Sequence, residues 1–279
     1  MTERELDMNA IVGTHDLALI VLDTLRYDVA AEELAAGRTP HLAALFPGGW
    51  ERRHSPGTFT YAAHAAFFAG FLPTPAAPGR HRRRLALNFE GSETIGPQTC
   101  VLEGATIVEG LFARGYHTLC VGGVGFFNLR NPLGRALPEL FAERHWDPST
   151  GVTDPASFEH QIAIVERSLG ALPPARRVFT FVNVSALHQP NHFYLARELA
   201  ERDAAAGAGA GVDTRASHAA ALRYVDRHMP RLCAALSRRG PVLAIVCSDH
   251  GTLYGEDGYF GHRVAHPIVT TVPYAEALL

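Results

Sequence analysis

The sequence contains no lysine, so all 25 basic side chains are arginines. We take this absence to reflect genomic composition more than function. Against 28 acidic residues the formal net charge is −3. A net charge so close to zero produces no overall electrostatic attraction to nucleic acid or to an anionic membrane surface. We therefore expect neither a nucleic acid polymer nor a membrane among its partners.

Cysteine is scarce, and long apolar runs are missing. None of the four cysteines stands in a Cys-x-x-Cys pair, and two of them lie inside apolar runs, where a thiol behaves as a small hydrophobe. No stretch reaches the ~18 apolar residues of a membrane span. Residues 1–16 lack the basic and apolar regions of a signal peptide. These absences predict a reduced, cytoplasmic protein.

The remaining composition is that of an ordinary globular protein. The 279 residues are 47% hydrophobic with a mean hydropathy of +0.01. A chain of this size can bury a large core, and we expect a single domain over residues 1–279. Apolar strand-like runs alternate with helix-like segments. This alternation predicts an α/β fold in which helices sandwich a mostly parallel central sheet.

One apolar run ends abruptly in a carboxylate and an imidazole. Residues 242–247 are rich in β-branched side chains without alternation, which is typical of a strand buried on both faces. Ser248, Asp249, His250 and Gly251 follow directly. Open α/β sheets bind ligands at the carboxyl ends of their strands, and an Asp beside a His can share a cation there. The alternative is an Asp that caps a helix beside an exposed His.

A second unbroken apolar run, at residues 16–22, also ends in an acid. It predicts a central strand that presents Asp23 at its tip, followed by a helical stretch that ends near Gly37. Asp23 is therefore a second candidate metal ligand. Its alternative role is that of a helix N-cap.

Thr60 stands at the start of an Ala- and Phe-rich segment that follows a Pro-Gly turn and closes at Gly70. The pattern predicts a short helix. The free N–H groups at such a helix start favour an anion, so a phosphate could be held there while the Thr60 oxygen attacks it. The alternative is a plain N-cap, and these arguments do not separate Thr60 from Thr58.

Histidines gather beyond the predicted strands. The apolar strand at residues 178–184 leads to His188 and His192, for which a surface loop is the alternative. His262 and His266 follow the Asp-His pair within one further stretch of chain. They add potential ligands close to the tip of the strand at residues 242–247.

Together these motifs resemble the alkaline phosphatase/sulfatase superfamily, in the same order along most of the chain. Asp23 with the Thr-Leu-Arg-Tyr-Asp segment after it is similar to the first metal-ligand motif. Residues 60–70 are similar to the nucleophile segment of nucleotide pyrophosphatase/phosphodiesterases. Residues 248–251 match the most recognisable signature of the superfamily. His262 resembles the residue at the position of the active-site lysine of sulfatases, and His188 resembles the histidine of the His-x-Pro loop.

The resemblance implies a hydrolase of phosphate esters that acts on a small-molecule phosphate-type substrate, which could be a phosphomonoester, a phosphodiester or a phosphonate ester. It also implies one or two divalent ions. A mixed oxygen and nitrogen ligand set suits Zn²⁺ or Mn²⁺ better than Ca²⁺. The implied metal ligands are Asp23, Thr60, Asp249 and His250 for one ion, with His262 and His266 as further ligands of a weaker second site. In the alternative, His262, His266 and His188 stabilise the leaving oxygen or act as general acid and base. The implied catalytic residues are Thr60 as the nucleophile, with His262 and His188 beside it.

Departures from the superfamily pattern narrow this expectation. A threonine at position 60 cannot become the formylglycine of sulfatases, which argues against a type I sulfatase. Asn183 and Ser185 stand where two-metal relatives carry an Asp before the loop histidine, which puts the second metal site in doubt. The chain is also short, so that only residues 76–98 and 128–155 could supply a modest lid.

Two other functions stay open at this point. A phosphotransferase with an alcohol acceptor would use the same Thr60 nucleophile. A non-catalytic member of the superfamily would keep the metal and use its pocket to bind a small anion or a peptide. In either case we expect His64 to orient the nucleophile loop rather than to bind the metal.

Overall fold

The computed structural model describes residues 6–70, 74–88, 95–202 and 211–279. Its main sheet has eight strands in the order β3-β2-β12-β9-β1-β8-β6-β7. Five neighbouring strands are parallel: β9 (Val242–Cys247), β1 (Asp16–Leu22), β8 (Val178–Val184), β6 (His117–Val121) and β7 (Glu143–His145). The three at the other edge are antiparallel: β12 (Thr271–Leu278), β2 (Glu51–His54) and β3 (Thr74–Pro75).

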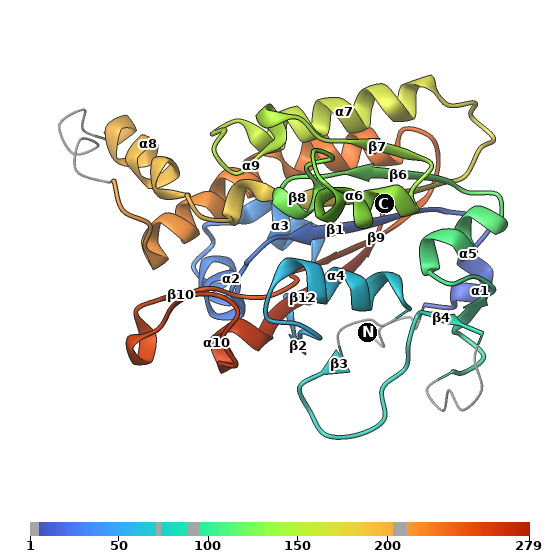
Figure 1. The fold of residues 1–279 in the computed structure, drawn as a ribbon, viewed down its shortest axis with the longest axis horizontal. Helices are drawn as coiled ribbons and strands as arrows, with labels where there is room; N and C mark the ends of the chain where they lie inside the picture. The colour runs from blue at the N-terminus through green and yellow to red at the C-terminus, as the bar shows by residue number, and fades with distance from the viewer. Residues whose placement is uncertain (1–5, 71–73, 89–94, 203–210) are drawn as a thin grey trace.

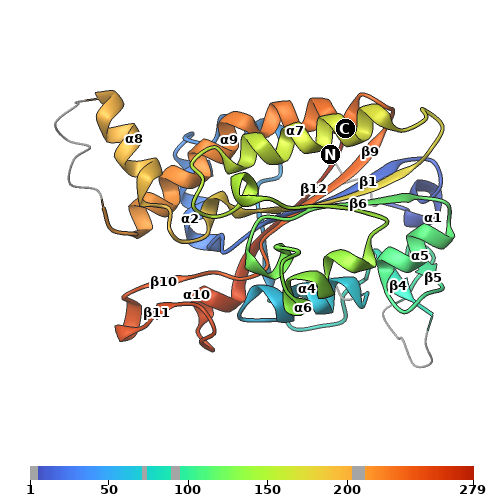
Figure 2. The same cartoon turned by 45° about the horizontal axis from the view of Figure 1, so that its top comes forward.

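Helices cover both faces of this sheet (Figures 1 and 2). Alternate residues of β1 enter two separate cores: Ala18, Ile20 and Leu22 face one, and Leu17, Leu19 and Val21 face the other. The first core packs against α2 (Tyr27–Ala35), α3 (Pro40–Leu45), α7 (Ser157–Ala171), α8 (His192–Arg202) and α9 (Arg215–Ser237). The second packs against α1 (Met8–Ile11), α4 (Thr60–Phe68) and α5 (Ile107–Ala113). The predicted α/β fold with a mostly parallel, helix-covered sheet is confirmed.

The three central strands are buried along their whole length. Every residue of β1, β8 and β9 is buried, as expected for apolar, β-branched strands inside a parallel sheet. β1 lies between β8 and β9, with Val21 opposite both Asn183 and Cys247. Because parallel strands end at one edge, residues that follow β1, β8 and β9 meet there.

The antiparallel edge brings two further segments to the same end of the sheet. β2 leads into the residues before α4, and β12 follows α10 (Pro267–Thr270). The two are tied together by a hydrogen bond from the Ser55 N–H to the Thr270 carbonyl, 2.8 Å long. A small hairpin, β10 (Leu253–Tyr254) with β11 (Phe260–Gly261), continues from the loop after β9. Long-range pairing therefore places residues 55–60 and 260–270 beside the tip of β9.

The two segments considered as lids lie at different places. In residues 76–98, β4 (Leu85–Leu87) pairs with β5 (Cys100–Leu102), and the Met8 N–H donates to the Gln98 carbonyl at 2.9 Å. Figure 1 shows β4 beside α1, at the end of the sheet away from α2 and α10. β4 therefore lies at the opposite end of the sheet from the tip of β1, and residues 89–94 lie outside the described residues.

Residues 128–155 run along the other end of the sheet. They contain α6 (Pro132–Ala136) and the edge strand β7. The Ser185 hydroxyl, just past β8, donates to the Thr150 carbonyl at 2.7 Å, and the Trp146 indole donates to the Gly123 carbonyl at 2.9 Å. This segment thus borders the carboxyl ends of β6 and β8, and its role as a lid stays a prediction.

None of the helices among the described residues has the length and apolar character of a membrane span.

Candidate active site

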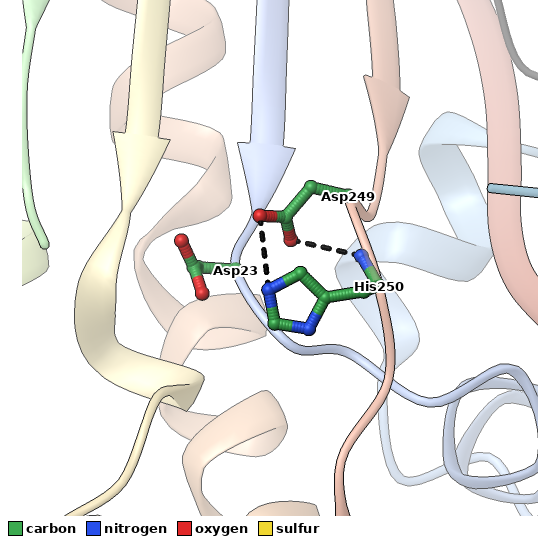
Figure 3. A group of neighbouring side chains, drawn as sticks. All are labelled: Asp23, Asp249 and His250. Atoms are coloured by element: carbon green, nitrogen blue, oxygen red, sulfur yellow. Dashed lines mark hydrogen bonds and ion pairs between the residues drawn. The ribbon is translucent and has the colours of Figure 1, made fainter. Parts of the chain in front are cut away.

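Two aspartates and a histidine meet at the carboxyl ends of β1 and β9 (Figure 3). Asp23 and Asp249 follow neighbouring parallel strands in equivalent register, so their side chains lie side by side. His250 is adjacent in sequence. One potential ligand atom from each of the three lies within 4.8 Å of the others. Within the described ranges this is the single group of three or more His, Cys, Asp or Glu side chains spaced to hold a metal ion.

Each carboxylate has one oxygen that accepts hydrogen bonds and, among the described residues, one that accepts none. Asp249 Oδ1 accepts hydrogen bonds from the Thr24 N–H at 3.2 Å and from the His250 N–H at 3.0 Å. Asp23 Oδ2 accepts one from the Asn183 amide at 2.8 Å. Asp249 Oδ2 and Asp23 Oδ1 have no hydrogen-bond partner in the part of the chain that the structure describes. Buried oxygens without a donor are costly, and a cation would satisfy both.

The electrostatics of the group lead to the same conclusion. Asp23, Asp249 and His250 are all 0% exposed. Burial raises the pKa of Asp249 to about 7. Burial, with the neighbouring charge of Asp249, raises the pKa of Asp23 to about 6. The protein alone therefore disfavours two ionised carboxylates here, whereas a divalent ion would favour them. The residues present fit a bound divalent metal.

His250 is fixed in the tautomer that a metal ligand needs. Its Nδ1 lies 2.9 Å from the Gly251 carbonyl, which can only accept, so Nδ1 carries the hydrogen and Nε2 keeps its lone pair. Burial lowers the pKa of His250, which favours this neutral form. A side chain at Gly251 would bring its Cβ within 2.1 Å of the Ile268 carbonyl oxygen. Glycine is therefore required where the chain turns away from the site.

Thr60 is the first residue of α4 and points at the same group. Its Oγ1 lies 3.4 Å from His250 Nε2 and 3.5 Å from Asp23 Oδ2, and the residue is 1% exposed. The start of this nine-residue helix adds a partial positive charge beside the hydroxyl. The structure thus brings Thr60 to the carboxylates. Thr58, the alternative nucleophile, accepts a hydrogen bond at its carbonyl from the Arg263 N–H at 2.8 Å.

Two of the other predicted histidines lie next to this group. The ring of His262 is centred 4.6 Å from the ring of His250, and the ring of His188 is centred 5.5 Å from that of His262. Burial, helped by the charges of His250 and His188, lowers the pKa of His262 to about 3, so its ring is neutral near pH 7. His262 Nδ1 has no partner among the described residues. The structure therefore brings His262 next to His250, with His188 beyond it.

His266 does not join the group. It caps α10, where its Nδ1 accepts from the Ile268 N–H at 3.1 Å. Its Nε2 lies 3.0 Å from the carboxylate of Asp257. Both ring nitrogens therefore have partners, and a role as a metal ligand would require these contacts to break.

His64 is buried beneath the nucleophile. Its Nδ1–H donates to the Thr60 carbonyl at 2.8 Å, and its ring packs edge-on against Phe67, Phe127 and Phe181. Burial lowers the pKa of His64 to about 3, so the ring is neutral. These contacts are those of a residue that orients the start of α4, as the sequence led us to expect.

Sequence reasoning missed two residues that touch the site or its neighbours. Asn183 appeared only as a departure from the superfamily pattern, yet its amide holds Asp23. Arg263 has a left-handed φ of 70°, and its guanidinium lies 5.5 Å from the centre of the Phe59 ring, next to Thr60. A single Arg in a loop gives no local signal, although its position directly after His262 could have drawn attention to it.

Comparison with known proteins shows the fold. No family model matches the sequence, and no curated protein matches it. Among solved structures, the C-terminal periplasmic domain of phosphoethanolamine transferase EptC from Campylobacter jejuni is similar with a TM-score of 0.60. The two sequences are 14% identical over 95% of this chain and 79% of that one. The C-terminal periplasmic domain of EptC from Escherichia coli, in complex with Zn, gives 0.58 at 11% identity over 95% and 72%.

A third similar structure names the superfamily directly. It is a protein in the alkaline phosphatase superfamily from Vibrio parahaemolyticus, with a TM-score of 0.52 at 14% identity over 95% of this chain and 60% of that one. The chain thus has the alkaline-phosphatase-like fold, and this neighbour belongs to the superfamily that the motifs of the chain resemble. Two of those neighbours are periplasmic domains. The cytoplasmic location of this chain stays a prediction.

Proposed function

We propose that the chain is a metal-dependent hydrolase of phosphate esters that uses Thr60 as its nucleophile on a small-molecule substrate. One observation carries the proposal. The Thr60 hydroxyl stands at a helix start, within 3.5 Å of Asp23 and of His250, beside two carboxylate oxygens that have no hydrogen-bond partner among the described residues. An alcohol is almost wholly protonated near pH 7, so a Thr placed here is useful as a nucleophile only beside a cation or a base.

Asp23, Asp249, His250 and the Thr60 oxygen would hold one divalent ion. Two carboxylates, an imidazole and a hydroxyl form a mixed oxygen and nitrogen set, which suits Zn²⁺ or Mn²⁺. When bound, such an ion lowers the pKa of a nearby hydroxyl and screens charge on the phosphoryl oxygens. The E. coli EptC domain in complex with Zn shows that a protein of this fold binds zinc.

The other residues of the chain have distinct tasks in this proposal. The N–H groups at the start of α4 bind the non-bridging oxygens of the phosphate. His64 holds the Thr60 backbone in place through its hydrogen bond to the Thr60 carbonyl. The rings of His262 and His188, which lie against each other, accept and return a proton at the attacking or leaving oxygen. Arg263 supplies a full positive charge for a phosphate that carries two negative charges.

Transfer to an alcohol instead of water is a second candidate. It would use the same nucleophile and the same phosphorylated Thr60, and only the acceptor would differ. The observation in its favour is that one structural neighbour is a phosphoethanolamine transferase. At 14% identity that likeness concerns the fold. Comparing products formed in water alone and with an added alcohol distinguishes the two reactions.

The decisive experiment is to trap phosphate on Thr60. The protein is supplied with Mn²⁺ or Zn²⁺, mixed with p-nitrophenyl phosphate or its bis-ester, quenched in acid and digested for mass spectrometry. We expect a phosphopeptide that contains Thr60, which Thr60→Ala removes and Thr58→Ala retains. Turnover without any phosphorylated Thr60 would refute the nucleophile assignment. Tight metal binding without turnover or trapping would favour a non-catalytic member that binds a metal or an anion.

A further inference from the structure

Asn183 lies beside the proposed cation site, at the carboxyl end of β8. It stands opposite Val21 in the β1–β8 register, and Val21 lies two residues before Asp23 in the sequence. The residue is 0% exposed. A buried amide on a strand that is otherwise largely apolar costs free energy unless all of its polar groups are paired. Its partners therefore indicate why the strand carries it.

The side chain of Asn183 joins two segments. Its Oδ1 accepts a hydrogen bond from the Val124 N–H at 3.0 Å, and its Nδ2 donates to Asp23 Oδ2 at 2.8 Å. Because the Val124 N–H can only donate, it fixes which side of the amide carries the oxygen. The NH₂ group must then face Asp23. The orientation of this amide is thus determined by the backbone and not by the carboxylate.

The contact leaves Asp23 with one oxygen in use and one free. Asp23 Oδ2 receives the Asn183 hydrogen and lies 3.5 Å from the Thr60 hydroxyl, while Oδ1 has no hydrogen-bond partner among the described residues. The donated hydrogen favours the ionised carboxylate and opposes the effect of burial, which raises the pKa of Asp23. A carboxylate at position 183 would instead face Asp23 without a hydrogen between them. Only a neutral side chain of this length can reach Asp23, donate a hydrogen bond to it and so favour its ionised form.

We propose that Asn183 is a positioning residue that orients the Asp23 carboxylate at the cation site. The inference rests on the proposed function, because it assumes that Asp23 is a metal ligand. Partners that hold a ligand in place typically contribute about 10- to 100-fold to metal affinity. Asn183 contributes in this way without touching the ion or the substrate.

The test compares Asn183→Leu with Gln161→Leu. Gln161 Nε2 donates to the Asn183 carbonyl at 2.6 Å and to the Gly122 carbonyl at 3.2 Å, so it supports the same strand end without contacting Asp23. Mn²⁺ affinity is measured by calorimetry, and the visible absorption of bound Co²⁺ reports the ligand arrangement. We expect a 10- to 100-fold weaker Mn²⁺ affinity and an altered Co²⁺ spectrum for Asn183→Leu. Gln161→Leu should lower the stability of the fold. Its Mn²⁺ affinity should stay within about threefold of the wild type, and its Co²⁺ spectrum should be unchanged.

Equal losses of Mn²⁺ affinity in the two variants, or no loss in Asn183→Leu, would overturn the inference. If Asn183→Leu does not fold, the wild type provides the test. Its Asn183 side-chain amide, labelled with ¹⁵N, should exchange slowly with water and shift on addition of Zn²⁺; fast exchange or no shift would overturn it. A wild type that binds neither Mn²⁺ nor Zn²⁺ would refute the proposed function itself. Failure of the Asn183 inference can therefore be distinguished from failure of the proposed function.

Discussion

The site has an inner and an outer group that are built differently. The inner group is Asp23, Thr60, Asp249 and His250, which are at most 1% exposed and stand on strand ends and a helix start. The outer group is His188, His262 and Arg263, which stand on loops and are partly or fully exposed. Rigid core elements thus hold the residues assigned to the cation and the nucleophile. The residues that would meet the rest of the substrate depend on loop contacts.

Loop contacts of the outer group explain how it stays in place. The hairpin β10–β11 that precedes His262 is attached by an ion pair between Arg26 and Glu256. The Tyr254 hydroxyl of the same hairpin lies 3.1 Å from the Asn191 amide, on the loop that carries His188. Arg26 is buried, so breaking this attachment would leave a buried charge without its full set of partners. Because the hairpin is attached through Arg26 and Tyr254, single substitutions in the outer group should cost the fold less stability than substitutions in the inner group.

Removal of the metal should have the largest effect, because it disables the inner group as a whole. A bound ion contributes several kcal/mol to a phosphoryl transition state, and each ~1.4 kcal/mol is a factor of ten in rate. Dialysis against a chelator should therefore lower turnover of phosphate esters by at least about 10³-fold. Adding back Zn²⁺ or Mn²⁺ should restore it. Full activity in the chelated protein would contradict the role assigned to the inner group.

His262→Ala should have the next largest effect. A residue that moves a proton in the transition state contributes about 10²- to 10⁴-fold, and we expect a loss near the lower bound because His188 stands next to it. Metal content should not change. His266→Ala is the matched control, since that ring caps α10 and should cost stability but little activity. A loss of metal in His266→Ala would instead make it a ligand, as its place in the sequence predicted.

The stability of the metal-free protein should fall as pH rises from about 4 to about 7. Burial raises the pKa of Asp249 to about 7, so the folded state binds its proton more tightly than the unfolded state in this window. Asp249→Asn removes the titrating group. In chelator, urea unfolding should show the variant to be more stable than the wild type at pH 8 by about 1–3 kcal/mol, with the difference shrinking toward pH 4. A difference that does not change with pH would refute this account of the inner group.

Arg263→Ala should have the smallest effect. Its side chain is exposed and screened by salt, so a loss of no more than about tenfold in kcat/KM is expected. The loss should appear mainly in KM and should be greater for a phosphate monoester, which carries two charges, than for a diester. An equal loss for both ester types would argue that Arg263 shapes the loop through its backbone.

The sequence predicted the inner group better than the outer group for a physical reason. The apolar runs that become β1 and β9 can be recognised locally, and parallel strands must end at one edge, so Asp23 and Asp249 had to meet. The start of α4 at Thr60 likewise follows from a Pro-Gly turn and an Ala-rich segment. These elements can be recognised from short stretches of sequence, without knowing which distant segments contact each other.

The outer parts depend on pairing between distant segments. The antiparallel edge formed by β2, β3 and β12 was not predicted, and it decides where the chain around His262 lies. His266 was predicted as a ligand from its nearness in sequence, whereas the short helix α10 uses its ring as a cap. The contact of Asn183 with Asp23 depends on strand register, which composition and spacing do not reveal.

The central claim is that the inner group holds one divalent ion. Elemental analysis of the purified protein by inductively coupled plasma mass spectrometry, after loading with Zn²⁺ or Mn²⁺ and desalting, tests it directly beside Asp249→Ala and His262→Ala. We predict about one equivalent of metal in the wild type and in His262→Ala, and none in Asp249→Ala. No metal in the wild type, or equal retention in Asp249→Ala, would show that the buried carboxylates serve the fold and not a cation.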